Sequence, residues 1–520
     1  MPFYPPTPAE IDRAVKAWLA AAPPMATGLA AAETFADIEQ LASRIGRSIA
    51  CQLTEQTLHQ QADDQAAEVP CPQCGRVCRV TRRTRQLITV AGEVSYAEPA
   101  SHCTSCRRDF FFARVKLRLD ERRYSPDLQR RLAETTAAIK SFEQTAAVAK
   151  CWIDLALSSR HAGRVIEELG AELVDHRDAF VDDIVHHRQE PAGPDPQHEL
   201  AAVFVDGGRV QTRVEKPGQG NGVHDPHWQE DKIARLQTMT TQTFAVDPCP
   251  EPPACFLDVR KLEQFLDPKE TRENPASAAE SVDLPRERWQ PKPLARSCVA
   301  TMRGIDEFRW MVMAEAKRRH FFTAQRRAFV ADGQAYNWTL HAGQFSDFVP
   351  ILDFLHLASY LYAAAKVGDA ATVDQRYECW VRAAWQGRSG EILTELQASL
   401  TQAGIDDTKL PDDHAWRPVQ KAATYLTHHH DKTNYPQYRK QGLPTTSSLI
   451  ESQIKEFNAR IKGSEKFWNE TNAEAILQII AWGLRNDGPT LREQLAKRPG
   501  CVFRRRSNMK TPSHIANGVT

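Results

Sequence analysis

The chain is 520 residues long and carries 66 basic and 66 acidic residues, so its formal net charge is zero. Hydrophobic residues make up 42% and charged residues 25%, which is ordinary for a folded protein and argues against global disorder. No apolar run reaches the roughly 18 residues that a membrane-spanning helix needs, and a secretory signal pattern is absent from the start. We therefore expect a cytoplasmic protein of several domains without membrane contact.

Charge is unevenly distributed along the chain. Residues 1–70 carry a net charge of −5, from four basic and nine acidic residues, whereas residues 71–131 carry +8, from fourteen and six. The final segment, 491–520, carries +6, from seven basic residues and one acidic residue. Clustered basic residues attract a phosphate backbone, so both basic segments indicate DNA binding, with a solvated surface as the alternative. Residues 1–68 are rich in alanine and have helical apolar spacing, which predicts an N-terminal helical region.

Two cysteine pairs with the same internal spacing form the sharpest motif. Cys71 and Cys74 are followed, after a gap of 28 residues, by Cys103 and Cys106. A two-residue gap lets both thiolates of one turn face the same ion, and four thiolates close a tetrahedral zinc site. A hairpin pattern lies between the pairs, so residues 69–112 are predicted to form a zinc ribbon with one structural Zn²⁺.

Three short helices are predicted between residues 125 and 173, where Ser125-Pro126, Ser141 and Ser158 mark their starts. A trio of this size suits a helix-turn-helix unit, whose third helix, residues 159–169, would enter the major groove. A helical trio without DNA contact is the alternative. Residues 186–196 are predicted to be a polar linker.

Two buried-strand patterns each run into an aspartate. Residues 200–205 precede Asp206, residues 327–331 precede Asp332, and a glycine follows each acid. Because α/β folds gather active sites at the carboxyl ends of their strands, we expect both carboxylates at one edge of a sheet. Taken singly, each Asp-Gly pair is more simply an ordinary turn. Residues 209–215 are predicted to form a following antiparallel strand.

A third acid is placed by helical spacing between residues 447 and 462. Apolar residues recur there at intervals of four, three and four and predict one buried stripe, formed by Ile450, Ile454, Phe457 and Ile461. Glu451, Lys455, Asn458 and Lys462 follow the same intervals one residue later. The carboxylate of Glu451 would therefore lie beside the core, with basic and amide groups behind it. A solvated Glu-Lys pair is the alternative.

A third strand pattern, residues 349–352, precedes a predicted helix over residues 354–366 with Asp353 and His356 at its start. From there to about residue 439 the pattern stays helical and predicts an α-helical insertion. Residues 247–293, with nine prolines, are predicted to be a long loop.

Two further features of the insertion invite a functional interpretation. Trp380 and Trp385 are of a type that stacks on displaced bases, although core packing is the simpler prediction. Residues 428–430 are three adjacent histidines, which cannot all face one ion from a regular element, so an exposed polar segment is predicted. Residues 224–227 receive the same interpretation.

The order of these parts resembles the ribonuclease H-like core of DDE transposases: a strand with Asp206, a strand with Asp332, and the helix Leu449-Ile-Glu451 through Gly463. Asp353-Phe-Leu-His356 is similar to the Asp/Cys-x-x-His signature of the Mutator-like branch, which also carries a helical insertion before its glutamate. The cysteine and helical modules resemble the DNA-binding front of bacterial insertion-sequence transposases. The resemblance implies a multidomain α/β protein with a ribonuclease H-like mixed sheet.

The resemblance also implies an order of domains. They are an N-terminal helical region (1–68), a zinc ribbon (69–112), a helix-turn-helix-like domain (113–185), the first part of the ribonuclease H-like core (200–353) with its proline-rich insert (247–293), the α-helical insertion (354–440), the core segment with the glutamate helix (441–490) and a basic tail (491–520).

The activity implied by the resemblance is metal-dependent cleavage and strand transfer of DNA at element ends. Asp206, Asp332 and Glu451 would hold two Mg²⁺ (or Mn²⁺) ions, and the freed 3′-hydroxyl would attack target DNA. His356 would contact the scissile phosphate or orient a carboxylate, with a structural hydrogen bond as the alternative. Joining two ends implies a homodimer or larger assembly on DNA, within the nucleoid.

Two other functions remain open at this point: a zinc-ribbon DNA-binding regulator without catalysis, and a structure-specific DNA nuclease on the same fold. The side chains predicted to contact DNA are Arg82, Arg83, Arg85, Arg160, Arg164, Lys455, Asn458, Arg460 and Lys462.

Overall fold

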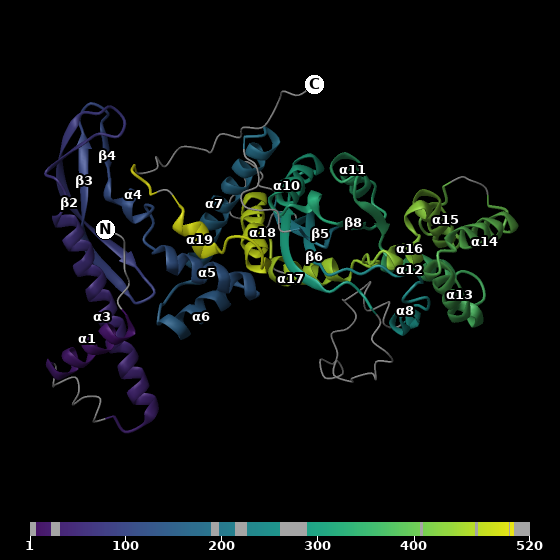
Figure 1. Ribbon diagram of the computed structural model, residues 1–520, viewed down its shortest axis with the longest axis horizontal. Coiled ribbons are helices and arrows are strands. Elements are labelled where there is room, and N and C mark those ends of the chain that lie inside the picture. The colour runs from purple at the N-terminus through teal and green to yellow at the C-terminus, as the bar shows by residue number, and fades with distance from the viewer. Residues whose placement is uncertain are drawn as a thin grey trace. The chain divides into compact units, whose positions relative to one another are not determined.

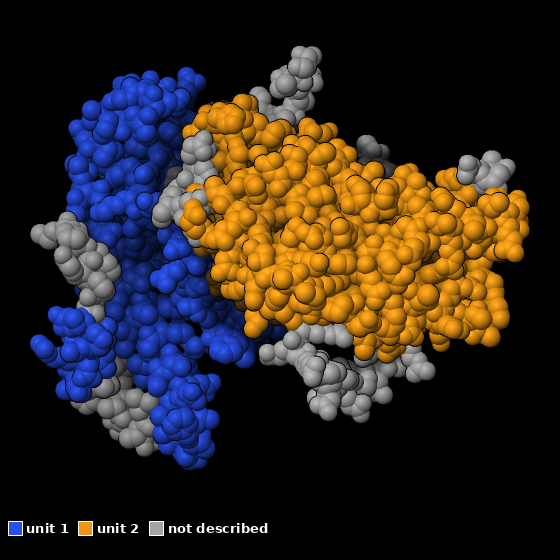
Figure 2. Space-filling view, turned by 45° about the vertical axis from the view of Figure 1, so that its right-hand side comes forward, with its two compact units in different colours: residues 1–132, 146–157, 489–520 blue, residues 133–145, 158–488 orange. Residues whose placement is uncertain are grey.

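A computed structural model of the chain describes residues 7–21, 32–188, 197–213, 226–259, 289–405, 409–462, 466–498 and 500–503. Contacts divide the chain into two compact units, which Figure 2 shows in blue and orange. Unit 1 comprises residues 1–132, 146–157 and 489–520, and unit 2 comprises residues 133–145 and 158–488. The chain is a mixed α/β protein with one sheet in each unit. Among the residues that the structure describes, no helix is long and apolar enough to cross a membrane.

Several sequence predictions fall wholly or partly outside the described residues. They concern most of the linker (189–196), the middle of the proline-rich segment (260–288), residues 224 and 225, Gly463, and the basic tail at 499 and from 504 onward.

Unit 1 combines helices with a four-stranded antiparallel sheet of order β1-β2-β3-β4. Its elements are α1 (Pro8–Ala21), α3 (Phe35–Asp63), β1 (Glu68–Pro70), β2 (Val77–Ile88), β3 (Glu93–Cys103), β4 (Arg108–Phe110), α4 (Ala113–Leu117) and α19 (Leu491–Ala496), together with parts of α5 (Pro126–Ala138) and α6 (Phe142–Ile153). Thr34 caps α3 through a reciprocal pair of hydrogen bonds with Asp37. The predicted N-terminal helices and the hairpin between the cysteine pairs are confirmed.

The three helices predicted between residues 125 and 173 are present, and they start where the serine signals place them. The third, α7 (Ser159–Val185), differs in extent, because it continues past residue 169 for a total length of 27 residues. Its apolar face, including Ile166 and Leu169, is buried, and α7 packs on α18 (Glu470–Leu484) and α10 (Ile305–Arg318) within unit 2. The candidate recognition helix is therefore also a structural helix of the larger unit.

The sheet of unit 2 has five strands in the order β7-β6-β5-β8-β9. They are β5 (Leu200–Arg213), β6 (Pro226–Met239), β7 (Pro293–Thr301), β8 (Arg326–Ala331) and β9 (Val349–Leu352). The first three in chain order pair antiparallel, whereas β8 lies parallel to β5 and β9 parallel to β8.

The strand that carries Asp206 differs from its prediction. Instead of ending there and returning as a strand over 209–215, β5 runs straight through Asp206 to Arg213 and pairs with β6. Gly208 lies opposite Asp231 of β6, and a Cβ atom at Gly208 would come within 2.7 Å of the Asp231 carboxylate. The glycine therefore makes room for a neighbouring side chain and does not mark a turn.

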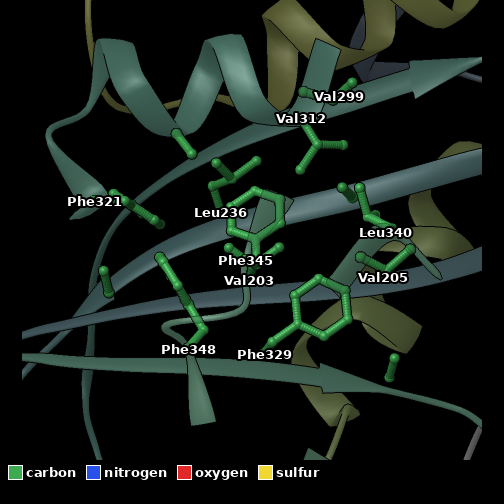
Figure 3. Packing of buried hydrophobic residues seen from close by; sticks show 14 of the residues in the cluster. Val203, Val205, Leu236, Val299, Val312, Phe321, Phe329, Leu340, Phe345 and Phe348 are labelled. Atoms are coloured by element: carbon green, nitrogen blue, oxygen red, sulfur yellow. The ribbon is translucent and has the colours of Figure 1, made fainter. Parts of the chain in front are cut away.

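One face of this sheet forms the main core of unit 2. Figure 3 shows Val203 and Val205 of β5 and Phe329 of β8 packed against Val312 of α10 and Leu340 of α11 (Ala335–Gln344). Burying each such side chain contributes about 1.5–3 kcal/mol, so this layer holds the strands in place. The opposite face is covered by α17 (Ser448–Ile461) and α18. The predicted stripe of Ile450, Ile454, Phe457 and Ile461 is buried there, as expected.

A helical stretch follows β9, as predicted, and Figure 1 shows α13, α14 and α15 gathered at one end of unit 2. The remaining elements are α8 (Ala254–Leu257), α12 (Phe354–Ala365), α13 (Val373–Trp385), α14 (Ser389–Gln402), α15 (Arg417–His429), α16 (Tyr435–Lys440) and the 3₁₀ turns Phe321–Thr323, Ala370–Thr372 and His430–Lys432. Trp380 and Trp385 are buried and donate to Glu395 and to the carbonyl of Cys249, each at 2.8 Å. They pack in the core, and the start of the proline-rich segment is anchored against α13.

Candidate functional sites

The four paired cysteines of unit 1 converge. Their sulfur atoms all lie within 4.8 Å of one another, with Cys71 3.9 Å from Cys106 and Cys74 3.6 Å from Cys103. A tetrahedron with zinc–sulfur bonds of about 2.3 Å has edges of about 3.8 Å, so the spacing suits a metal such as zinc. The amide of Cys106 lowers the pKa of Cys103 to about 6, with help from the neighbouring thiols against the effect of burial, which favours the thiolate that a metal needs.

Apolar side chains pack beside these thiols. Phe110 of β4 is buried in the same cluster, and Phe112, Val502 and Phe503 pack against it. Cys78, also in this cluster, donates its thiol to the carbonyl of Arg76 at 3.3 Å. Cys71 and Cys103 are thus buried, whereas Cys106 is half-buried and Cys74 is exposed.

The predicted DNA contact at Arg85 is wrong, because its side chain is buried in an ion network. Arg85 pairs with Glu98 at 2.7 Å and donates to the carbonyls of Asp120 and Arg122 at 2.6 and 2.9 Å. Arg114 binds the same carboxylate through two nitrogens, at 2.8 and 2.6 Å. A turn of Arg85 toward a phosphate would therefore break a nearly buried ion pair and two hydrogen bonds.

The remaining arginine candidates stay at the surface. Arg82 and Arg83 are exposed and form ion pairs with Asp63 at 2.5 Å and Asp109 at 2.7 Å. Arg160 and Arg164 are exposed in the first turns of α7. Exposed ion pairs of this kind contribute little stability and exchange readily. The DNA contacts of these four arginines stay predictions.

Unit 2 gathers acidic groups where three strands point the same way. The parallel pairing aligns Val205 with Ala331 and Ala331 with Leu352, and the next residue of each strand is an aspartate: Asp206, Asp332 and Asp353. Side chains alternate along a strand, so Asp206 points away from the core of Figure 3, toward the face that α17 covers, whereas Asp332 and Asp353 lie just beyond the ends of β8 and β9. Asp353 was not among the predicted ligands, although it follows β9 as Asp332 follows β8.

Asp353 joins two helices that start at this edge. One carboxylate oxygen accepts from the amide of His356 at 2.9 Å and from its ring Nδ1 at 2.7 Å. The other accepts from the amide of Ser447 at 2.6 Å, at the start of α17. Burial alone would raise the pKa of Asp353, but these hydrogen bonds and the charge of His356 lower it. Asp353 therefore holds His356 and the Glu451 helix in a fixed relation.

Glu451 and His356 face each other across this bridge. Ligand atoms of Asp353, His356 and Glu451 lie within 4.8 Å of one another, and Glu451 accepts from the Ser447 hydroxyl at 3.0 Å. Burial and the charge of Asp353 raise the pKa of Glu451. Burial alone would lower the pKa of His356, but its bond to Asp353 and the charges of Asp206 and Asp332 raise it to about 10. The imidazolium balances part of the negative charge.

Asp206 and Asp332 belong to the same electrostatic cluster. Burial raises the pKa of Asp206 to about 7, Asp332 and Glu451 add to the rise, and His356 and the Gly207 amide oppose it. Asp332 is buried and accepts from the Asn337 side chain at 2.7 Å and the Gln334 amide at 3.0 Å. Several carboxylates with one imidazolium leave an excess of negative charge. Among the described residues, ligand atoms of Asp353, His356 and Glu451 lie close enough together to hold a metal ion, whereas Asp206 and Asp332 are not part of that group.

The residues predicted to contact DNA from α17 have different environments. Arg460 is buried, donates to the carbonyls of Thr136 and Lys140 at 3.1 and 3.2 Å, and lies over the Phe142 ring, so its predicted contact is wrong. Lys455 is exposed and Asn458 is half-buried. Burial raises the pKa of Asp231 to about 6. Lys462, also half-buried, lies close enough for its charge to oppose this rise.

One of the three adjacent histidines also departs from its prediction. His429 is buried, and its Nε2 lies 3.2 Å from the carbonyl oxygen of Gly333, the residue after Asp332. His428 and His430 are exposed, as expected. Helix α15 of the insertion therefore touches the turn that presents Asp332.

Comparison with solved structures finds similar chains, whereas comparison of the sequence finds none. No protein-family model matches the sequence, and no curated protein matches it. One similar chain belongs to the Drosophila P element transposase strand transfer complex. The matched region covers 71% of this chain and 94% of that chain, with 9% sequence identity and a TM-score of 0.30.

Proposed function

We propose that this protein is a DNA transposase of the DDE type, which cleaves DNA at element ends and joins the cut ends to target DNA. The observation that carries the proposal is the alignment of Asp206 and Asp332, which directly follow the paired residues Val205 and Ala331, with Glu451 close enough for its charge to raise the pKa of Asp206. Asp206, Asp332 and Glu451 are each separated from the next by more than a hundred residues along the chain. Carboxylates that the fold holds near one another despite their repulsion are typical of a functional site.

The sheet itself supports the assignment of the core. Three antiparallel strands followed by two parallel strands, with the first aspartate on the first strand, agree with the ribonuclease H-like mixed sheet that the sequence predicts. We assign the core to residues 200–353 and 441–490, with the α-helical insertion at residues 354–440.

Asp206, Asp332 and Glu451 would hold two Mg²⁺ or Mn²⁺ ions, with Asp353 and His356 beside them. Such ions stabilise the attacking and leaving oxygens of a phosphodiester exchange. The residues of this chain prepare the site: Asn337 orients Asp332, Ser447 orients Glu451, and Asp353 orients His356. The imidazolium of His356 is suited to bind a phosphate oxygen.

The DNA-binding part of the proposal rests on unit 1 and the start of α7. We assign one structural Zn²⁺ to the four cysteines and DNA contacts to Arg82, Arg83, Arg160, Arg164, Lys455, Asn458 and Lys462. Two ends must be joined, so the working form would be a homodimer or larger assembly on DNA, within the nucleoid.

The test uses purified protein, Mg²⁺ and DNA that carries the ends of its own element. Asp332→Asn keeps the size and hydrogen bonds of the side chain but removes its charge, so cleavage should fall at least about a hundredfold while DNA binding persists. The matched control is Asp347→Asn, an exposed aspartate whose side chain is 72% accessible, which should cleave normally. Undiminished cleavage by Asp332→Asn would exclude the site.

The products separate the proposed activity from its alternatives. Joining of cut ends to a second DNA identifies a transposase, whereas cleavage without joining identifies a nuclease. Binding without any cleavage identifies a regulator.

A further inference from the structure

The helical insertion contains a groove between α12 and α15. Two adjoining cavities, of about 570 and 290 Å³, share Ser359, Ala363 and Pro418 in their walls. A volume of this size receives a single base or nucleotide, whereas a DNA duplex is far too wide. Ser359 and Ala363 of α12 have short side chains, which keeps that wall of the groove open to flat groups.

The walls of this α12–α15 groove carry an excess of positive charge. Lys366, Arg417 and Lys421 line it, against one acid, Asp412. Asp412 pairs with Arg417 at 3.2 Å and with Lys421 at 3.0 Å, but its side chain is 82% exposed, so these pairs are weak and open to exchange. The groove therefore suits an anionic ligand.

An aromatic ring lies in the same wall. Tyr360 lines the smaller cavity and stacks on Tyr425 with ring centres 4.1 Å apart and planes 17° from parallel. Tyr360 is half-buried, and Tyr425 behind it is buried. A ring fixed from behind at the side of a basic groove is a platform for a base, since stacking needs a rigid surface and tolerates any sequence.

The groove and the acidic cluster share one helix face. His356, Ser359, Tyr360 and Ala363 follow each other at intervals of three, one and three along α12, and Lys366 comes one turn later. The ten steps from His356 to Lys366 span about 15 Å, at about 1.5 Å per residue. A DNA strand covers this distance in roughly four nucleotides, at about 3.4 Å each.

We propose that the α12–α15 groove binds the unpaired DNA strand next to the phosphate held at the acidic cluster. Lys366, Arg417 and Lys421 would contact its backbone, and Tyr360 would stack on one of its bases. This inference rests on the proposed function, because the strand reaches the groove only from that cluster. It adds to the duplex contacts of unit 1 a path for a single-stranded segment of about four nucleotides, which runs along α12 from the acidic cluster and ends in the groove.

Measuring binding without added Mg²⁺ or Mn²⁺, and without a chelator that would remove zinc, separates this inference from catalysis. We would measure the affinity of the full chain for a labelled element-end duplex, blunt or with a four-nucleotide overhang on either strand. One overhang should bind more tightly than the blunt duplex. Lys366→Glu/Lys421→Glu should abolish that advantage and weaken overhang binding about 25-fold at 0.1 M salt. The slope of log binding constant against log salt concentration should fall by about 1.4, the share of two phosphate contacts on a single strand. The affinity of this double variant for the blunt duplex should not change.

Two sets of variants keep the result interpretable. Arg382→Glu/Arg388→Glu makes the same charge change on exposed residues of the insertion outside the groove and should keep the advantage of the overhang. Tyr360→Leu should reduce the affinity advantage of overhang DNA by about fivefold or more. Tyr360→Phe keeps the ring and should retain that advantage.

Equal affinity for blunt and overhang DNA, or an advantage that survives the Lys366→Glu/Lys421→Glu change, would overturn the inference. Competition by free deoxynucleotide at equal potency would also overturn it, because it would identify a small-molecule pocket. Failure of the protein to bind any of these duplexes would refute the proposed function itself.

Discussion

At the scale of single residues, the tightest constraint at the acidic cluster is the glycine after Asp332. A Cβ atom built on Gly333 would lie 2.0 Å from the ring of Tyr425. The carbonyl of the same residue lies 3.2 Å from His429. Two side chains of α15 thus close on the backbone that carries Asp332, and the position of that carboxylate depends on a helix far along the chain.

Gly333→Ala should therefore damage the site through lack of space. Overpacking costs about 1–3 kcal/mol, so we expect a lower melting temperature and weaker metal-dependent cleavage. Gly343→Ala is the control, because that helical glycine of α11 has no atom within 4 Å of an added Cβ. Adding Tyr425→Leu to Gly333→Ala should restore part of the loss, and a purely additive double variant would contradict the steric explanation.

At the scale of elements, the sequence predicts those helices and strands whose apolar residues recur at regular intervals. Strands β8 and β9 and helices α12 and α17 lie where their patterns place them. Strands β6 and β7 were missed because polar residues interrupt their patterns. Arg235 and Gln237 of β6 are buried, and Arg235 donates to the carbonyl of Leu449 at 2.9 Å, a partner 214 residues away. A local pattern cannot anticipate hydrogen bonds supplied by distant segments.

The candidate site was predictable to a similar degree. Strand patterns and helical spacing pointed to Asp206, Asp332 and Glu451, whose role stays a prediction, whereas the hydrogen bonds of Asp353 depend on the assembled edge. The errors at Arg85 and Arg460 have the same origin, since both arginines find buried partners that neighbouring residues do not reveal.

Helix α10 supplies a prediction about pH. Glu315 is held by Arg318 through two hydrogen bonds, at 2.8 and 2.7 Å. Burial would raise the pKa of Glu315, but Arg318, Arg485 and the Ser297 hydroxyl lower it to about 2. Its stabilising effect should therefore be complete above the unfolded-state pKa, near 4.5, and should disappear as pH falls toward 2.

Glu315→Gln should lower the melting temperature at pH 6, and the difference from the unmodified protein should shrink between pH 5 and pH 2. Thermal denaturation at a series of pH values measures this. Glu307→Gln alters an exposed acid of the same helix and should give only a small difference throughout. A gap between Glu315→Gln and the unmodified protein that grows toward low pH would contradict the ion-pair explanation.

At the scale of the whole molecule, the two units have separate cores, and one of them is organised by four thiols. Binding of a metal to a folded thiolate set stabilises the unit that contains it. Cys74→Ser should remove about one zinc per chain in elemental analysis and lower the unfolding transition of unit 1. Cys151→Ser, at an exposed cysteine of the same unit, is the control. Equal shifts in every transition would show that the units unfold as one.

The apolar side chains beside the thiols include Val502 and Phe503, which the ribosome makes after all of unit 2. At about 5–20 residues per second, the nearly 400 residues between Phe110 and Val502 take roughly 20 to 80 s to synthesise. During that interval the nascent thiols lack part of their cover and stand open to oxidants and to competing metals. Zinc supply and thiol-reducing capacity during translation should therefore decide how much of the newly made protein matures correctly.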